Sequence, residues 1–428
     1  MAKNPTDATA DVPASKFRSP LKRVTDKTVG VPNIISVDDH VVPLPDLWTS
    51  RLPSKFRDAA PRVAREKGVL QGKTWKLDDA NGQLADVWHF DLIASVIPME
   101  SAAAGFEQSE IDARPMTYEE MRPGCHDQVG RLSDMMLNHV DASVNFPDVF
   151  PGYCGEVFSG VADKALALAC IQVYNDWMID EWCGGEGTGR LVPLTLIPHW
   201  DPLSSVAEVQ RCAAKGSHAV SFSESPHALG FPTYHSGEWE PFFAACQETG
   251  TTVAIHRGSS PRAYTDDPDA PWGTDSTLHF QYGLHSLIDL VISGVPERFE
   301  DLNIAYSECE VAWMPYVLER MDHQWERRMH NPRRRIRLSE RPSTYVKSRI
   351  YGCIIDDEVG IRTRDHGIDI DHLMIESNYP HGNGYFPRTV EMVAELCART
   401  DLTDDEIYKF TRGNAIKAFG LERYGIAS

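Results

Sequence analysis

The sequence predicts an α/β fold in which eight parallel strands alternate with helices, as in a (β/α)8 TIM barrel. Short apolar runs, typical of parallel strands that are buried on both faces, alternate along the chain with longer amphipathic segments. Eight such units within about 300 residues match the size of a barrel of this kind. A doubly wound open sheet is the alternative, but no G-x-G-x-x-G motif follows the first strand and no phosphate-binding loop is present.

The individual elements follow from the spacing of apolar residues. In chain order, the predicted strands are 34–37, 142–146, 191–198, 219–222, 252–255, 302–307, 350–355 and 372–375. The predicted helices are 162–180, 204–215, 239–249, 285–293, 313–325 and 387–398.

Three segments describe the domain organisation. Residues 1–30 lack periodicity and are predicted to form a polar N-terminal tail. Residues 31–428 are predicted to form the barrel. Within it, residues 45–131 are too long for a simple loop, so we interpret them as an inserted lid or subdomain after the first strand.

Composition excludes several classes of protein. The 428 residues include 42 Lys and Arg against 62 Asp and Glu, a net charge of −20, which argues against nucleic-acid binding because phosphate recognition needs a basic face. No stretch approaches the roughly 18 apolar residues of a membrane span. The N-terminus has no apolar leader, and the nine cysteines include no C-x-x-C pair. These features favour a cytoplasmic protein.

Residues of metal-ligand type follow the predicted strands at five of the eight positions. The active site of a barrel lies at these carboxyl ends, so the side chains are expected to converge. A lone carboxylate there is more often a helix cap or an ion-pair partner, and a lone histidine is more often structural. Their coincidence instead favours a metal site. The candidate ligands are Asp38, His40, Glu224, His256, Glu308 and Glu376.

The chain resembles the amidohydrolase superfamily, in the branch that contains aminocarboxymuconate-semialdehyde decarboxylase and related amidohydrolase-2 proteins. The similar stretches include IISVDDHVVPLPDLW, TTVAIHRG, ESNYPHGNGYFP and RGNAIKAFGL, and they occur in family order over nearly the whole chain after residue 33. The resemblance implies a distorted barrel with metal ligands on strands 1, 5 and 8. It also implies a bridging ligand on strand 4 in binuclear members and a functional histidine on strand 6.

This chain departs from the family pattern at four strand ends. Strand 1 carries Asp38-x-His40 in place of the usual His-x-His, and strand 6 offers Glu308 in place of the usual histidine. Strand 4 offers Glu224 where binuclear relatives place a bridging ligand. Strand 8 has Asn378 in place of an aspartate that binds metal or activates water. An amide cannot serve as a general base.

These departures favour a non-haem dinuclear iron oxygenase that uses dioxygen to hydroxylate a bulky organic substrate. Carboxylate ligands suit oxygen-loving ions such as iron, and the six candidate ligands are those named above. The alternative is a hydrolase or non-oxidative decarboxylase of a small carboxylic or aromatic acid, with one zinc or manganese ion. A degenerate barrel that only binds or scaffolds is a third, less favoured interpretation, because His40 and His256 are retained.

Further residues are candidates for substrate binding and catalysis. Arg333, Arg334 and Arg335 belong to the one dense basic run, which suits a phosphate such as that of a coenzyme A thioester, although such runs are more often solvated or contact another subunit. His381 is a candidate for proton transfer, and Asn378 for a catalytic role beside it. The expected partners are a small-molecule substrate and, as in relatives, a second copy of the chain; the sequence identifies no electron donor.

Overall fold

The computed structural model describes residues 30–71, 74–262, 264, 267, 269–331, 333 and 336–427. Apart from Gly30, the predicted polar tail lies outside the described residues.

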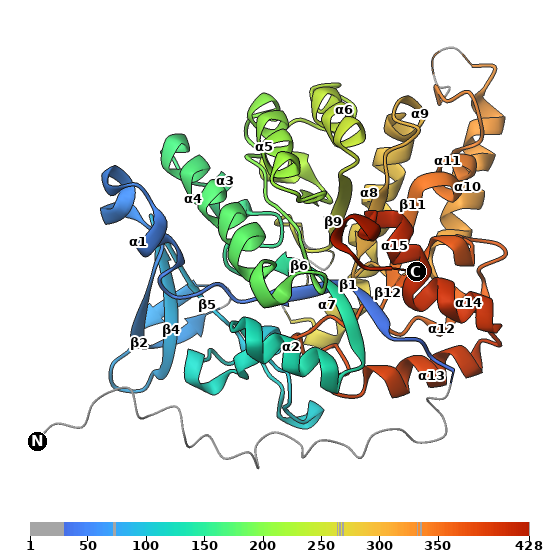
Figure 1. Ribbon diagram of the computed structural model, residues 1–428. Helices are drawn as coiled ribbons and strands as arrows, with labels where there is room; N and C mark the ends of the chain where they lie inside the picture. The colour runs from blue at the N-terminus through green and yellow to red at the C-terminus, as the bar shows by residue number, and fades with distance from the viewer. Residues whose placement is uncertain are drawn as a thin grey trace, which may run out of the picture.

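Eight parallel strands confirm the predicted barrel (Figure 1). Three of them pair in the order β1-β6-β7 and five in the order β12-β11-β10-β9-β8. Each coincides with one of the eight apolar runs. Their bounds are β1 Ile34–Val41, β6 Val140–Pro147, β7 Leu191–Pro193, β8 Ala219–Ser223, β9 Thr252–His256, β10 Ile304–Ser307, β11 Ile350–Ile354 and β12 Leu373–Ile375.

The two sheets are joined at both edges. A single parallel bridge between Thr195 and Val220 links β7 to β8. At the other edge, the backbone N–H of Asn378 donates to the carbonyl of Asp38 at 3.0 Å, which ties the end of β12 to β1. The barrel is therefore closed but irregular at these two seams, and the second seam lies beside the candidate ligands.

Alternation along the strands builds two apolar layers. Residues such as Ile35, Val37 and Val144 fill the barrel interior, while their neighbours face the surrounding helices. The longer helices are α2 Gln128–Leu137, α4 Lys164–Trp177, α5 Pro202–Ala214, α6 Glu240–Thr249, α8 Phe280–Ile292, α10 Met314–Arg328, α11 Pro342–Arg349 and α13 Thr389–Arg399. The shorter ones are α1 Leu47–Arg51, α3 Glu156–Ser159, α7 Trp272–Leu278, α9 Val295–Arg298, α12 Glu358–Arg362, α14 Asp404–Tyr408 and α15 Asn414–Phe419.

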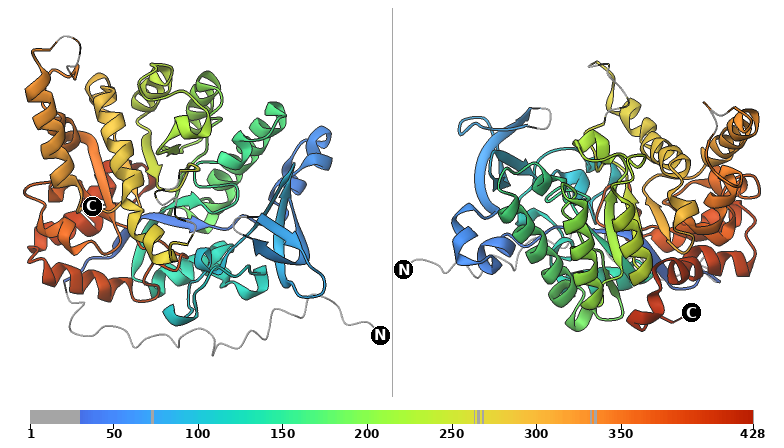
Figure 2. Two further views of the ribbon diagram at one scale, coloured as in Figure 1. Left: turned by 180° about the vertical axis from the view of Figure 1, so that it is seen from behind. Right: turned by 90° about the horizontal axis from the view of Figure 1, so that it is seen from above.

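The segment between β1 and α2 contains a separate antiparallel sheet. Its order is β3-β2-β4-β5, and it stands at one side of the barrel in each view (Figures 1 and 2). The strands are β2 Arg62–Gln71, β3 Thr74–Leu77, β4 Gln83–Phe90 and β5 Ile93–Val96. Downstream of the sheet, two backbone hydrogen bonds connect the insertion to the loop after β12. The N–H of Ala103 donates to the carbonyl of Pro380, and the N–H of Gly382 donates to the carbonyl of Glu100. That residues 45–131 act as a lid stays a prediction.

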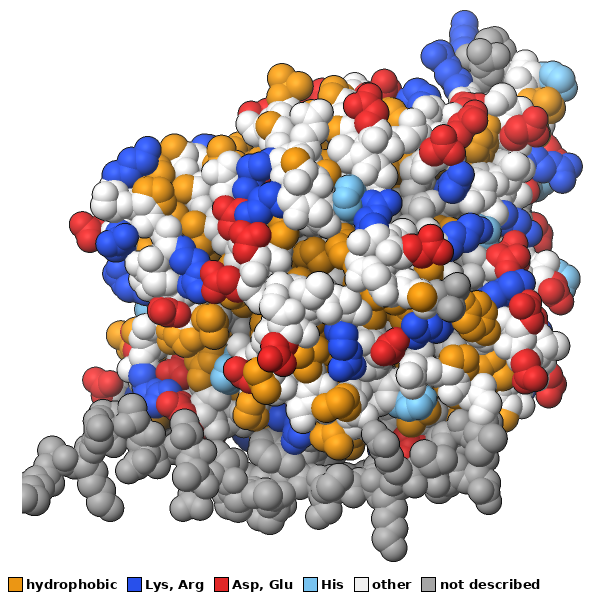
Figure 3. Space-filling model, in the orientation of Figure 1, with side chains coloured by type: hydrophobic (Ala, Val, Ile, Leu, Met, Phe, Trp, Pro, Cys, Tyr) orange, Lys and Arg blue, Asp and Glu red, His pale blue; other side chains and the backbone are white. Residues whose placement is uncertain are grey.

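The surface carries both signs of charge. Acidic and basic side chains are interspersed over most of the face that Figure 3 shows. None of the helices in the described part of the chain combines the length and apolarity that crossing a membrane requires.

Candidate metal centre

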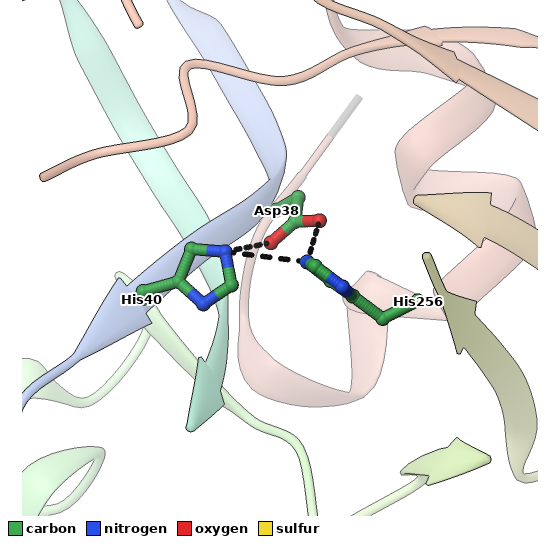
Figure 4. Close-up of side chains that lie close together, drawn as sticks. All are labelled: Asp38, His40 and His256. Atoms are coloured by element: carbon green, nitrogen blue, oxygen red, sulfur yellow. Dashed lines mark hydrogen bonds and ion pairs between the residues drawn. The ribbon is translucent and has the colours of Figure 1, made fainter. Parts of the chain in front are cut away.

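Three side chains from opposite sides of the barrel meet at its carboxyl end (Figure 4). Asp38 and His40 leave β1, and His256 is the last residue of β9. His40 Nε2 lies 3.3 Å from Asp38 Oδ1, and His256 Nε2 lies 3.4 Å from Asp38 Oδ2. The two Nε2 atoms are 3.4 Å apart. All three side chains are fully buried.

In both imidazoles, a hydrogen bond from Nδ1 to a backbone carbonyl leaves Nε2 facing the cluster. Nδ1 of His40 bonds the carbonyl of Pro147 at 2.9 Å, and Nδ1 of His256 bonds the carbonyl of Arg257 at 2.6 Å. A carbonyl accepts only, so each Nδ1 carries the proton and each Nε2 presents a lone pair. Burial lowers the pKa of His256 to about 4 and the pKa of His40 well below its usual value, which keeps both rings neutral.

The Asp38 carboxyl oxygens make no well-directed hydrogen bond among the described residues, although the hydroxyl of Ser307 acts to lower the pKa of the group. Burial, together with the carboxylates of Glu376 and Glu308, raises the pKa of Asp38 well above its usual value. A buried carboxyl group that meets two nitrogen lone pairs needs a proton or a metal cation between them. Two imidazoles and one or more carboxylates are a donor set that suits zinc, manganese or iron, so these residues fit a divalent metal ion.

Glu308 borders this cluster from the end of β10. Its Oε1 lies 3.9 Å from His40 Nε2, and its Oε2 forms an ion pair with Arg257 at 2.5 Å. Burial acts to raise the pKa of Glu308, but Arg257 and the neighbouring His381 hold it well below its usual range. The carboxylate is therefore ionised and placed to complete a ligand set with Asp38 and the two histidines.

His381 and Asn378 reach Glu308 from the loop after β12. The ring of His381 stacks on His40 with centroids 3.8 Å apart, and its Nδ1 lies 3.4 Å from Glu308 Oε1. Its Nε2 lies 3.8 Å from Asp148 Oδ1. Burial acts to lower the pKa of His381, but Asp148 and Glu308 outweigh it and raise the pKa to about 9. Asn378 Nδ2 donates to Glu308 Oε1 and, at 2.9 Å, to Asn383 Oδ1.

Neither Glu224 nor Glu376 belongs to a group of possible metal ligands among the described residues, although Glu376 is near enough to Asp38 to raise its pKa. Glu224 accepts from the hydroxyl of Ser260 at 2.6 Å and from that of Ser259. Glu376 is buried and accepts the backbone N–H of Glu308 at 3.1 Å. Arg333 is exposed, and Arg334 and Arg335 lie outside the described residues.

A second group that can hold a metal consists of His40, Glu308 and His381. It shares His40 with the first group, and only Nε2 of that imidazole is free of a carbonyl partner. Since one imidazole nitrogen binds one ion, the two groups describe a single centre that extends from Asp38 to Glu308.

Sequence reasoning missed Arg257 and Asp148. Arg257 forms an ion pair with Glu308, and Asp148 faces His381. The ring of Tyr153, which the sequence offered only as one of several aromatic residues that could cover a substrate, stacks on His256 with centroids 4.3 Å apart. The position of Arg257 directly after a candidate ligand was a usable signal, because that position also lies at the active-site end of a barrel. Asp148 gave the same signal, since it stands two residues after the predicted strand 142–146.

A cavity of about 570 Å³ borders the centre at His381. Its walls come from residues 103–108, from Ile111 and from the segment 381–388 that follows β12. A cavity of this size accommodates a small organic molecule.

Comparison with known proteins gives a family and a fold. The profile of the family described as Amidohydrolase matches residues 55–421. The structure resembles an amidohydrolase from Mycobacterium avium subsp. paratuberculosis K-10, at 18% identity and a TM-score of 0.67, over 91% of this chain and 99% of that chain. No curated protein matches the chain.

Two similar solved structures are decarboxylases that hold manganese. A dihydroxybenzoic acid decarboxylase from Polaromonas sp. JS666, with 2-nitroresorcinol as inhibitor, is 14% identical with a TM-score of 0.58, over 91% of this chain and 98% of that chain. A 5-carboxyvanillate decarboxylase from Novosphingobium aromaticivorans DSM 12444, complexed with 4-hydroxy-3-methoxy-5-nitrobenzoic acid, is 21% identical with a TM-score of 0.55, over 68% of this chain and 79% of that chain. At these identities the likeness is one of fold.

Proposed function

The chain belongs to the amidohydrolase family, and on that premise we propose that it is a divalent-metal-dependent, non-oxidative decarboxylase of a small carboxylic or aromatic acid. The buried Asp38 carboxylate, which faces two imidazole lone pairs and makes no well-directed hydrogen bond among the described residues, is the observation that carries the proposal. Asp38, His40 and His256 would hold the ion, and Glu308 would complete the set. Manganese or zinc suits these donors.

A bound divalent ion would polarise a substrate oxygen and stabilise negative charge as the carbon–carbon bond breaks. In that step the carboxyl group leaves as carbon dioxide and its bonding electron pair stays on the substrate carbon. His381 would deliver a proton to that carbon, since its ring lies against His40 and between two carboxylates that keep it protonated. Asn378 supports decarboxylation over hydrolysis, because its amide cannot take a proton from water.

The predicted diiron oxygenase has less support than this alternative. Glu224, which was to bridge two iron ions, is bonded to Ser259 and Ser260, and the described residues supply one centre. Two of the three similar solved structures reported above are decarboxylases with manganese, which favours neither iron nor dioxygen. Coenzyme A recognition and a homodimer stay predictions.

Release of carbon dioxide under argon tests the proposal. Manganese-loaded protein would be incubated with a panel of hydroxybenzoates, and carbon dioxide and the decarboxylated ring would be measured in equal amounts. His381→Gln should lower kcat by about 100- to 10,000-fold, because it removes the proton donor, while its manganese content stays at the wild-type value. His366→Gln, which changes an exposed histidine, is the matched control. Product that forms only with oxygen, in protein that retains two iron ions per chain, would refute decarboxylation.

A further inference from the structure

The side chain of Arg257 is a half-buried cation at the edge of the candidate metal centre. It follows the candidate ligand His256 directly, and only 19% of the side chain is exposed. Its backbone is held on both sides, since its N–H donates to the carbonyl of Ser307 at 3.3 Å and its carbonyl accepts from His256. The position of Arg257 is therefore fixed by β9 and β10 together.

Most N–H groups of the Arg257 guanidinium have no hydrogen-bond partner among the described residues. It carries five N–H groups, but among the described residues its one partner is Glu308 Oε2, and it donates no well-directed hydrogen bond. Two other arginines, the buried Arg131 and the half-buried Arg122, differ: Arg131 donates to the carbonyls of Gly124 and His40, and Arg122 donates to both oxygens of Asp134. Because donors that are largely shielded from water cost free energy when they are unmet, the unused N–H groups of Arg257 are suited to a ligand.

The charges around the centre favour an anionic ligand. Glu308 is the one carboxylate that pairs with Arg257 among the described residues, and a divalent ion in the centre would compete for its charge. A carboxylate of a ligand offers the planar pair of oxygens that a guanidinium binds in parallel.

We propose that Arg257 anchors a carboxylate of the substrate at this centre. The anchor rests on the proposed function, because it assumes that the substrate binds at this metal centre. Glu308 would then act through both carboxylate oxygens. Oε1 would lie beside the ion, and Oε2 holds the guanidinium of Arg257 in place.

Titration calorimetry with two matched probes tests the anchor. The probes are 2,6-dihydroxybenzoate and resorcinol, which share a ring and differ by the carboxylate. In manganese-loaded protein, Arg257→Gln should weaken binding of the acid by on the order of 10- to 100-fold and leave resorcinol unchanged. Arg257→Lys should bind the acid with intermediate affinity, since it keeps the charge without the fork. Arg51→Gln, which breaks a surface ion pair with Glu181, is the matched control.

Several outcomes would overturn the anchor. Equal losses for the acid and for resorcinol would mean that Arg257 only maintains the shape of the site through Glu308. Unchanged affinity for the acid in Arg257→Gln, or failure of the wild-type protein to bind the acid, would also refute it. Circular dichroism and manganese content of each variant show whether it folds, and Arg257→Lys gives a second measurement if Arg257→Gln does not. Tight, Arg257-dependent binding of the acid without release of carbon dioxide would instead refute the proposed function and leave the anchor standing.

Discussion

Glu308 and Asn378 form a matched pair at the ends of two strands. Both have left-handed backbone conformations, with φ of 53° and 50°, which non-glycine residues rarely adopt and which cluster at functional sites. These turns bring the carboxylate and the amide face to face, so that Asn378 donates to Glu308 Oε1. A carboxylate at position 378 would instead repel Glu308. The two departures from the family pattern on strands 6 and 8 are thus physically linked.

Substituting Asn378→Asp should reveal this link. In metal-free protein it places two carboxylates together, and we expect the free energy of unfolding to fall by about 1–3 kcal/mol. Adding Glu308→Gln to that variant should restore most of the loss, because the new amide can donate in the reverse direction. Urea unfolding of the two single variants and the double variant measures the coupling. Additive effects would mean that the pair does not interact.

The Glu224→Ala substitution tests whether Glu224 is a buried structural carboxylate or a ligand that bridges two metal ions. Since Glu224 accepts from Ser259 and Ser260 and lies apart from the cluster, we expect the metal content per chain to stay unchanged. The unpaired hydroxyls should lower stability by about 1–3 kcal/mol. Metal analysis of purified protein checks the first expectation and urea unfolding the second. A halved metal content would restore the bridging role that the sequence suggested.

The candidate site could be predicted in part at the scale of residues. Asp38, His40 and His256 meet because carboxyl ends of parallel strands share one end of a barrel, a rule that needs no coordinates. Whether a carboxylate at a strand end turns inward depends on the backbone that follows it. Glu308 turns toward His40 through a left-handed residue, whereas Glu224 meets two serines from a neighbouring loop. No pattern in the sequence distinguishes these two outcomes.

At the scale of elements, regular alternation decided what could be predicted. The eight barrel strands are confirmed because their apolar runs are buried on both faces. The antiparallel strands of the insertion were missed, since β2, with the sequence RVAREKGVLQ, is largely exposed or half-buried and shows no clean period of two. β7 ends at Pro193, short of the predicted 198, although the apolar run continues. A run of apolar residues alone therefore overestimates the length of a strand where the two sheets of the barrel meet.

The first residue of α3, Glu156, is an acid with a raised pKa. Burial, followed by the carboxylate of Glu224, raises the pKa of Glu156 to about 7, although the N–H of Cys154 donates to it at 3.1 Å. The folded state holds this proton more tightly than the unfolded chain, whose carboxyl has a pKa of about 4.5. The contribution of Glu156 to stability is therefore greatest below pH 4.5 and falls as the pH rises to 7.

Substituting Glu156→Gln should remove that dependence. At pH 8 we expect the variant to be more stable than wild type by up to about 3 kcal/mol, and at pH 5 the difference should nearly vanish. Urea unfolding at the two pH values measures both. Glu186→Gln, which changes an exposed acid, serves as the control. A variant that is less stable at both pH values would show that Glu156 is ionised and needed as an acceptor.

At the scale of the whole molecule, the candidate centre connects distant parts of the barrel. Asp38 and His40 come from β1, His256 from β9 and Glu308 from the end of β10, and β1 and β9 belong to different sheets. Those sheets are joined at one edge by a single bridge and at the other by loop hydrogen bonds. An ion held by these ligands therefore adds a connection between the sheets, and it removes the cost of an unpaired buried carboxylate.

Manganese should therefore stabilise the entire fold and not only the site. Binding to the native state alone adds about 2.7 kcal/mol at a free metal concentration of 100 times Kd, so the melting temperature should rise with metal and fall with chelator. Magnesium should stabilise less, because it prefers oxygen ligands and here meets two imidazoles. In His256→Asn the shift should largely disappear, since the ligand from the second sheet is lost. A manganese shift that persists undiminished in His256→Asn would place the stabilising ion elsewhere in the molecule.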